Sequence, residues 1–168
     1  VSPYGFHKLM AEMICKEFHQ LFGLQIAVVR PFSVYGPGLK KQLFWDLFQK
    51  YNAGQRTIEV WGTGKESRDF IYIDDLILLL QHIMQNGQFA CNVYNAASGK
   101  EVTIEKALTA MFALLDATVQ LQFNNKVREG DPLNWRAGIT IAEELGFTNK
   151  TTFEQGIEKL VAWYKSQN

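Results

Sequence analysis

Apolar residues recur at helical spacing near the start of the chain, and Gly23 follows the last of them. Ser2 is a suitable N-cap and Pro3 a suitable first helical residue, so the pattern predicts a helix over residues 3–22. A glycine directly after the stripe is typical of a helix end. The apolar stripe consists of Leu9, Ile14, Phe18, Leu21 and Phe22.

The rest of the chain alternates between short apolar runs and helical patterns. The run at 25–30 is continuous, which is typical of a buried parallel strand. A loop over 31–39 follows it, because Gly36, Pro37 and Gly38 are unfavourable in a helix. Further strands are predicted at 57–61, 70–73, 91–95 and 119–123, and further helices at 43–53, 74–87, 103–115, 140–145 and 152–165.

This alternation of strands and helices predicts the α/β class. Asp74 or Asp75 and, further on, Thr103 stand where a helix N-cap is expected. No G-x-G-x-x-G turn follows a predicted strand, although a complete dinucleotide-binding fold has one near its first strand. Because the chain also opens directly on a helix, we expect it to be a truncated piece of a longer protein.

Charge and composition exclude several classes of function. The 168 residues are 47% hydrophobic, enough for one globular domain with a core. Seventeen Lys and Arg balance 17 Asp and Glu, so no general field attracts nucleic acid or an acidic membrane. Any anionic ligand must therefore be held by a few well-placed cations.

The sequence offers no metal site and no membrane segment. Cys15 and Cys91 show neither metal-ligand spacing nor a disulfide framework, and the three histidines share no metal spacing. The longest apolar run, at 76–80, is far too short to span a bilayer. Without a visible signal peptide, a cytoplasmic protein is expected.

Tyr4 and Lys8 are the first candidates for chemistry. Residues four apart share one face of a helix, and an ammonium group near a phenol favours the phenolate. Such a tyrosine can exchange a proton at neutral pH. The Y-x-x-x-K spacing also occurs often by chance, so its weight comes from its place before a buried strand and a Pro-Gly-rich loop.

Three further segments carry candidate binding residues. The loop at 31–38 directly follows a parallel strand, where ligands bind in open α/β folds, although it is equally compatible with an ordinary connection. A glycine turn at 62–64 precedes Arg68, whose guanidinium suits a diphosphate. Arg128 suits phosphate and Asp131 suits ribose hydroxyls, with a surface ion pair as the alternative.

In their order along the chain, these segments resemble the extended short-chain dehydrogenase/reductase family, in its NAD-dependent epimerase/dehydratase branch. The resemblance rests on residues 2–8, 30–38, 62–75 and 128–132, and on the final segment 141–147. It covers essentially the whole chain. It implies the carboxy-terminal part of a Rossmann-type doubly wound parallel sheet together with a small α/β substrate-binding domain.

The resemblance also implies roles for single residues. Tyr4 would be the catalytic acid/base, with Lys8 as its partner and as a ligand of the nicotinamide ribose. Pro31 and Val34 would lie near the nicotinamide. The implied substrate-binding residues are Ser33, where the family often has asparagine, the strand around Val60 beside the nucleotide base, Arg68 and Arg128 on the diphosphate, and Asp131 on a ribose hydroxyl.

The implied activity is NAD-dependent epimerisation of a nucleotide-diphosphate sugar through a transient keto intermediate. A 4,6-dehydratase or reductase of the same family, acting with NAD or NADP, is the alternative, and a non-catalytic nucleotide-sugar binding module is a second one. Residues 1–38 would be a remnant of the NAD-binding domain and 39–168 mainly the substrate domain, with some segments returning to the Rossmann sheet. The intact enzyme would be a homodimer, and the fragment alone would be inactive because the absent half binds most of the cofactor.

Overall fold

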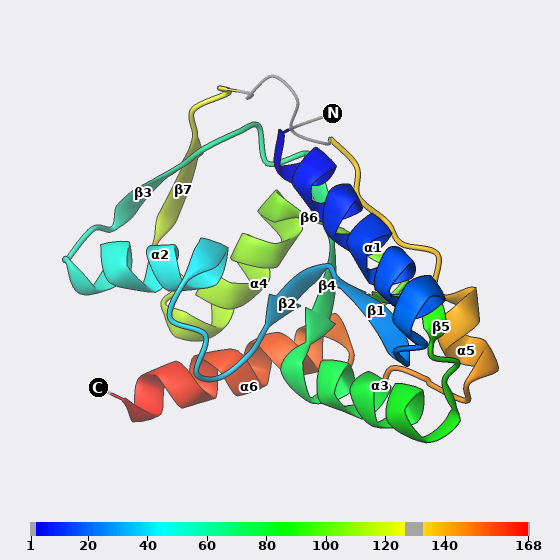
Figure 1. The fold of residues 1–168 in the computed structure, drawn as a ribbon. Coiled ribbons are helices and arrows are strands. Elements are labelled where there is room, and N and C mark those ends of the chain that lie inside the picture. The colour runs from blue at the N-terminus through cyan, green and yellow to red at the C-terminus, as the bar shows by residue number, and fades with distance from the viewer. Residues whose placement is uncertain (1–2, 127–132, 168) are drawn as a thin grey trace.

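The computed structural model describes residues 3–126 and 133–167 and confirms an α/β architecture (Figure 1). Six helices and seven strands are present in this part of the chain. The helices are α1 (Pro3–Phe22), α2 (Gln42–Asn52), α3 (Ile73–Asn86), α4 (Ile104–Leu115), α5 (Thr140–Glu144) and α6 (Phe153–Ser166). The strands are β1 (Ile26–Pro31), β2 (Ser33–Tyr35), β3 (Thr57–Val60), β4 (Ser67–Tyr72), β5 (Ala90–Ala96), β6 (Glu101–Thr103) and β7 (Gln120–Phe123).

The strands form three small sheets, and most of the pairing is parallel. β1 pairs with β5, β2 pairs with β4, and β3 pairs with β7, all in parallel register. β6 adds to β4 in antiparallel register. Figure 1 shows α1 lying along β1 and β5, while β3 and β7 project together from the body at the upper left.

Two strands were not predicted from the sequence. β2 falls inside the predicted loop at 31–39, because the helix-breaking residues begin only at Gly36 and Ser33 is free to pair opposite Phe70 of β4. β6 pairs Thr103 with Ser67 at the other end of β4. Both strands have three residues, too few to show a period of their own.

Strand β4 separates two hydrophobic cores. Phe70 and Tyr72 belong to a core with α2, α4 and α6, whereas Ile71 between them belongs to a core with α3 and β5. This division follows from strand geometry, since successive side chains point to opposite faces. Because residues 69–72 are all buried, β4 is covered on both faces and forms the centre of the molecule.

Tyr35 sits at the middle of the first core. Its ring lies 5.6 to 5.9 Å from the ring centres of Phe44, Phe70, Tyr72 and Phe153. Burial raises the pKa of its hydroxyl, which donates to the carbonyl oxygen of Phe153. A Cβ atom at Gly156 of α6 would lie 2.1 Å from that hydroxyl, so glycine is required for α6 to approach this closely.

The carboxylate of Asp69, in the middle of β4, is fully buried and accepts four hydrogen bonds. Oδ1 accepts from the backbone N–H and the hydroxyl of Ser98, both at 2.7 Å. Oδ2 accepts from the backbone N–H groups of Gly99, at 3.0 Å, and Ala137, at 3.1 Å. One side chain therefore joins β4 to two separate loops, and hydrogen bonds from the backbone offset the loss of hydration.

The predicted helix cap at Asp74 or Asp75 is wrong. α3 begins at Ile73, and its N-cap residue, Tyr72, makes no side-chain cap hydrogen bond. The Asp75 carboxylate is only 2% exposed and accepts from the backbone N–H groups of Lys150 and Thr151, at 2.9 and 3.1 Å. Neither Asp74 nor Asp75 is thus the cap. The predicted cap at Thr103 is confirmed, since its hydroxyl oxygen accepts from the backbone N–H of Lys106.

Helix α1 contacts the first sheet along one side. Arg30 at the end of β1 donates two hydrogen bonds to the Glu12 carboxylate, at 2.7 and 2.5 Å, and Cys91 Sγ donates to the carbonyl oxygen of Cys15. None of the described α1 residues is buried, so its predicted apolar stripe is exposed to solvent here. Within residues 3–126 and 133–167, no helix is long and apolar enough to cross a membrane.

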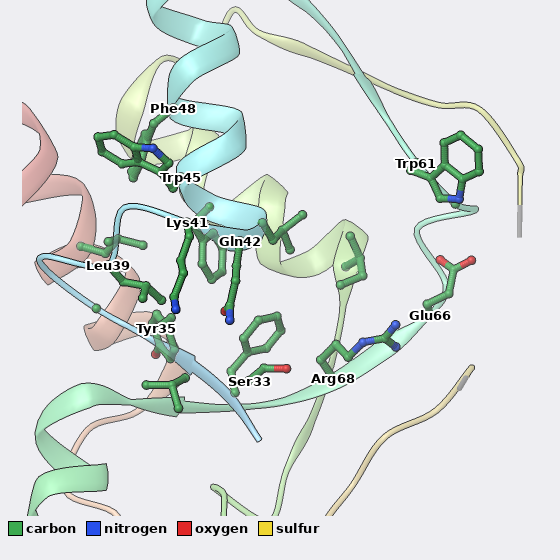
Figure 2. Close-up of a pocket in the computed structure, with 18 of the residues that line it drawn as sticks. Ser33, Tyr35, Leu39, Lys41, Gln42, Trp45, Phe48, Trp61, Glu66 and Arg68 are labelled. Carbon is green, nitrogen blue, oxygen red and sulfur yellow. The ribbon is translucent and has the colours of Figure 1, made fainter. Parts of the chain in front are cut away.

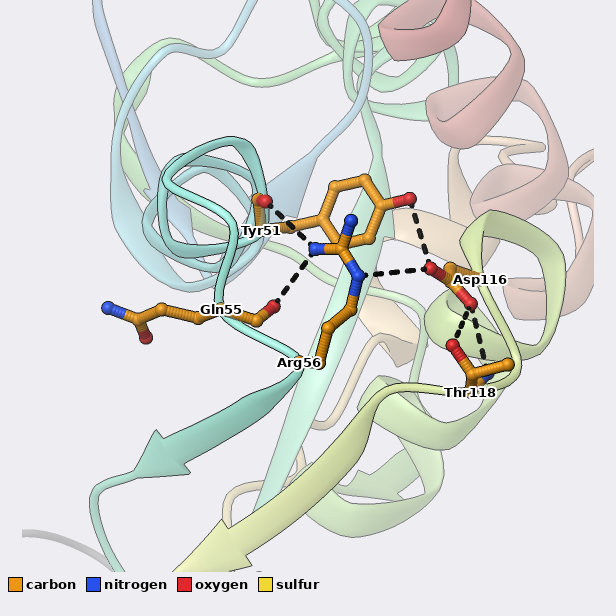
Figure 3. Close-up of polar contacts among 5 residues, drawn as sticks. All are labelled: Tyr51, Gln55, Arg56, Asp116 and Thr118. Carbon is orange, nitrogen blue, oxygen red and sulfur yellow. Dashed lines mark hydrogen bonds and ion pairs between the residues drawn. The ribbon is translucent and has the colours of Figure 1, made fainter.

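The two projecting strands start from one polar network (Figure 3). Asp116, at the end of α4, accepts from the Tyr51 hydroxyl at 3.2 Å and from the hydroxyl of Thr118 at 2.6 Å. Arg56 lies 3.7 Å from the same carboxylate and stacks over the Tyr51 ring. Hydrogen bonds from Thr118 hold the pKa of Asp116 below its usual value. The network fixes the start of both β3 and β7, and we call these two strands the β3–β7 arm.

We predict that Asp69→Asn lowers the free energy of unfolding by about 2–4 kcal/mol, measured by urea denaturation. An amide has a single acceptor oxygen, so its NH₂ group would face N–H donors that now have a carboxylate oxygen. Asp46→Asn is the control, because that carboxylate is 62% exposed in its pair with Lys50 and should contribute less than about 0.5 kcal/mol. Equal losses in the two variants would contradict a special role for Asp69.

We predict a pH-dependent contribution from the Glu12–Arg30 pair. The hydrogen bonds from Arg30 lower the folded-state pKa of Glu12, so the pair stabilises the fold above the unfolded pKa of about 4.3. This contribution, under about 1 kcal/mol for a partly exposed pair, is lost as the pH falls through the lowered folded-state pKa.

The measurement is urea denaturation of Glu12→Gln between pH 7 and pH 3. The wild type should be the more stable protein at neutral pH, and the difference should disappear on acidification. Glu17→Gln removes an exposed glutamate of the same helix and serves as the control. A difference for Glu12→Gln that is constant with pH would exclude the ion pair as its cause.

Candidate functional site

A cavity of about 300 Å³ lies between β2, β4, the start of α2 and the end of β3. Figure 2 shows Lys41 and Gln42 reaching from the start of α2 toward Tyr35 and Ser33, with Arg68, Glu66 and Trp61 on the opposite side. Much of its apolar lining comes from the first core or from residues packed against it. These residues include Leu43, Phe44, Trp45, Phe48, Phe70 and Leu160.

The connection from β2 to α2 forms one wall of the cavity. Ser33 and Val34 of β2 line it, together with Gly36 just beyond the strand. Gly36 has a φ of +150°, and a Cβ atom there would lie 2.5 Å from the Ile73 side chain, so only glycine fits. Gln42 has a φ of +67°, a left-handed conformation that costs a non-glycine residue about 1 kcal/mol or more. A strained residue is thus held at the cavity.

The opposite wall is formed by β4 and the turn before it. Arg68 lies on β4, and its Nη1 donates to the carbonyl oxygen of Ser67 at 2.7 Å. Glu66 accepts from the backbone N–H and the hydroxyl of Thr63, both at 3.0 Å. Burial alone would raise the pKa of Glu66, but these hydrogen bonds hold it below the usual value. Glu66 is thus a fixed, negatively charged acceptor.

The β3–β7 arm forms the mouth of the cavity. Both strands end there, and the backbone N–H of Gly62 donates to the side chain of Asn124 at 3.1 Å. Trp61 is 53% exposed, and Lys126 Nζ lies 5.7 Å from the centre of its ring. An exposed indole at a cavity mouth can stack on a flat ring of a ligand.

The charges of the lining favour an anion. Lys41, Arg68 and Lys126 line the cavity together with one carboxylate, that of Glu66. A concave site with an apolar floor and an excess of positive charge suits a ligand that has both a ring and an anionic group. The molecule as a whole carries no net charge, so this excess is local.

Tyr4 and Lys8 share one face of α1, as predicted. Lys8 Nζ lies 5.3 Å from the centre of the Tyr4 ring, and the Tyr4 side chain is 70% exposed. The same face continues through Glu12, Cys15 and His19, the half-buried side of the helix that contacts the sheet. Neither Tyr4 nor Lys8 is among the residues that line the cavity.

The structure brings some predicted site residues together and separates others. Ser33, Val34 and Arg68 line one cavity. Pro31 is exposed at the end of β1, and the Val60 side chain is buried in the first core, only 3% exposed. Arg128 and Asp131 lie outside the described residues.

Sequence reasoning missed several lining residues, including Lys41, Gln42, Trp61, Glu66 and Lys126. The sequence held a signal for Trp61. Side chains alternate along β3, so when Val60 faces the core, the adjacent Trp61 faces the opposite side. Across residues 3–126 and 133–167, no group of three or more His, Cys, Asp or Glu side chains is arranged to hold a metal ion.

Comparison with known proteins identifies relatives along nearly the whole chain. It is 27% identical over 167 residues to the uncharacterized UDP-glucose epimerase YtcB of Bacillus subtilis, covering 99% of this chain and 52% of that protein. It is 29% identical over 167 residues to UDP-glucuronate 4-epimerase of Thermodesulfobacterium geofontis, covering 98% of this chain and 51% of that protein. The chain thus spans about half the length of these relatives.

Solved structures show the same fold. UDP-glucuronic acid 4-epimerase from Bacillus cereus, in complex with UDP-glucuronic acid and NAD, superposes with a TM-score of 0.88 at 25% identity. The alignment covers 99% of this chain and 54% of that one. The expected fold, part of a Rossmann-type sheet with a small α/β domain, is thereby confirmed.

A family model also matches the segment that contains the Tyr4–Lys8 helix, the β1–β2 connection and β4. The match covers residues 1–97, more than half of the chain. This chain belongs to the NAD dependent epimerase/dehydratase family.

Proposed function

We propose that this chain is the carboxy-terminal, substrate-binding half of an NAD-dependent nucleotide-sugar epimerase. The observation that carries the proposal is the cavity in which Ser33 and Arg68 meet an apolar floor and an exposed tryptophan. Relatives named as UDP-glucose and UDP-glucuronate epimerases support the substrate class. In this arrangement residues 1–38 complete the NAD-binding domain, and 39–168 form mainly the substrate domain.

The nucleotide-diphosphate sugar lies across the cavity. Arg68 binds the diphosphate with its guanidinium, Trp61 at the end of the strand that contains Val60 stacks on the base, and Ser33 contacts the substrate. Lys126 and Leu133, the described residues on either side of 127–132, both line the cavity. By the family resemblance, Arg128 would bind the diphosphate and Asp131 a ribose hydroxyl.

Tyr4 moves the proton. Tyr4, whose ring centre lies 5.3 Å from Lys8 Nζ, would take the proton of a sugar hydroxyl, while the cofactor, when bound, would accept hydride from the same carbon. The product of this step is a keto-sugar. An epimerase turns the keto-sugar over before hydride returns to its other face, and Tyr4 then gives the proton back.

The residues present suit part of a nicotinamide cofactor. Tyr4 and Lys8 are exposed on one face, and Lys8 would bind the nicotinamide ribose. Pro31 and Val34 at the β1–β2 connection would lie against the nicotinamide. When bound, the cofactor supplies the hydride acceptor and donor. The adenosine half needs a glycine-rich turn that this chain lacks, so the isolated 168 residues should show no turnover.

The exposed stripe of α1 supports a homodimer of the intact enzyme. Leu9, Ile14 and Phe18 are between 44% and 52% exposed, and Leu21 and Phe22 more so. Apolar surface of this extent on one helix favours burial against another element. A helix-to-helix contact between subunits would bury it, and so would packing against the cofactor-binding half.

We predict that the intact enzyme binds UDP, dTDP or GDP sugars and that Arg68→Ala weakens this binding by about 10- to 100-fold in isothermal titration calorimetry. Lys106→Ala is the control, since Lys106 is an exposed cation paired with Glu154 and is not among the residues that line the cavity. Affinity weaker than about 1 mM for all these sugars would show that the substrate class is wrong.

We predict that Tyr4→Phe lowers the turnover of the intact enzyme by about 10²- to 10⁴-fold while substrate affinity changes little. Glu17→Gln, at an exposed position of α1 more than three turns beyond Tyr4, should leave turnover unchanged. Turnover of Tyr4→Phe within about threefold of wild type would exclude proton transfer by Tyr4. Analysis of the product separates the alternatives, because an epimerase returns a sugar of equal mass and a dehydratase releases water.

A further inference from the structure

The guanidinium of Arg68 lies against an aromatic row that the proposed function does not yet use. Arg68 Cζ is 5.5 Å from the centre of the Trp135 ring, and that ring is 5.8 Å from the ring of Phe32. Phe32 directly precedes Ser33, which lines the cavity. The row therefore runs from the β1–β2 connection to the cation in the opposite wall.

Trp135 is held by the two residues that flank Arg68. The backbone N–H of Ser67 donates to the carbonyl oxygen of Leu133 at 2.8 Å, and the backbone N–H of Trp135 donates to the Ser67 hydroxyl at 3.3 Å. The Asp69 carboxylate accepts from the backbone N–H of Ala137. These bonds fix the backbone of Trp135 beside Arg68, although the two residues are far apart in the sequence.

Packing alone does not account for an indole at this place. Trp135 is 46% exposed, so much of its apolar surface remains in water and contributes little to the core. A flat guanidinium, by contrast, gains from contact with an indole face, by about 0.5–2 kcal/mol. The edge of the same guanidinium is held by the carbonyl oxygen of Ser67.

We propose that Trp135 is a positioning residue that fixes the guanidinium of Arg68 for the diphosphate of the bound nucleotide. This inference rests on the proposed function, in which Arg68 binds that diphosphate. An arginine side chain in solution samples many rotamers and loses this freedom when it binds. With its guanidinium over the Trp135 ring and Nη1 on the Ser67 carbonyl oxygen, Arg68 is ordered before the ligand arrives, which strengthens binding.

The test is a double-mutant cycle in the intact enzyme, with UDP, dTDP and GDP as probes. Trp135→Leu should weaken the best-bound diphosphate by about 2- to 30-fold in an otherwise wild-type protein and have no further effect in Arg68→Ala. Trp135→Phe keeps an aromatic face and should retain affinity within about threefold. Arg136→Ala removes a hydrogen bond of the same segment, to the Gly99 carbonyl oxygen, and should leave affinity unchanged.

A second measurement needs no ligand. In NMR spectra, the Nε–H signal of Arg68 should show an upfield ring-current shift that Trp135→Leu abolishes and Trp135→Phe retains. Additive effects of Trp135→Leu and Arg68→Ala on affinity, or an Arg68 signal insensitive to Trp135→Leu, would overturn the positioning role. If Arg68→Ala itself left diphosphate affinity unchanged, the diphosphate role of Arg68 would fail, and the positioning role with it.

Discussion

The hydrogen bonds of one buried carboxylate, that of Asp69, tie the central strand β4, which forms one wall of the cavity, to two separate loops. Asp69 lies on β4, the strand whose two faces belong to different cores, and it binds one loop at 98–99 and another at 137. Buried charge is tolerated only where donors satisfy it, so both loops must take one conformation. Arg68 directly precedes Asp69, and Trp135 lies two residues before Ala137. The positions of both residues therefore depend on the hydrogen bonds of Asp69.

Local patterns in the sequence predicted most of the fold. Helix α1, strand β1 and the cap at Thr103 each follow from a few neighbouring residues, and the structure confirms them. The short strands β2 and β6 form by pairing with β4. In both pairings, the two paired residues are more than 30 positions apart in the sequence, so no local pattern predicts these strands. Asp75 stood where a cap is common, but the backbone N–H groups of residues 150–151 occupy its carboxylate. Tertiary contacts thus decided what local propensity left open.

The candidate site was predictable only in part. The loop at 31–38 was singled out because ligands bind where a parallel strand ends, and Ser33 within it through the family resemblance. Arg68 was singled out because a guanidinium after a glycine turn suits a diphosphate, and both residues line one cavity. Their partners come from segments without a readable pattern: Gln42 from a strained helix start, and Trp135 from an irregular polar stretch. Those side chains reach the site through long-range contacts that no periodicity encodes.

The β3–β7 arm restricts how this family member can diversify over evolution. Its two parallel strands start together at the Asp116 network (Figure 3) and end together at Trp61, with the core-facing Val60 one residue before. Substitution at the mouth leaves this alternation intact. An inserted or deleted residue between network and mouth would exchange the two faces, and would bury a tryptophan position while exposing a valine position. The mouth can therefore change by replacement of side chains, but not by a change in strand length.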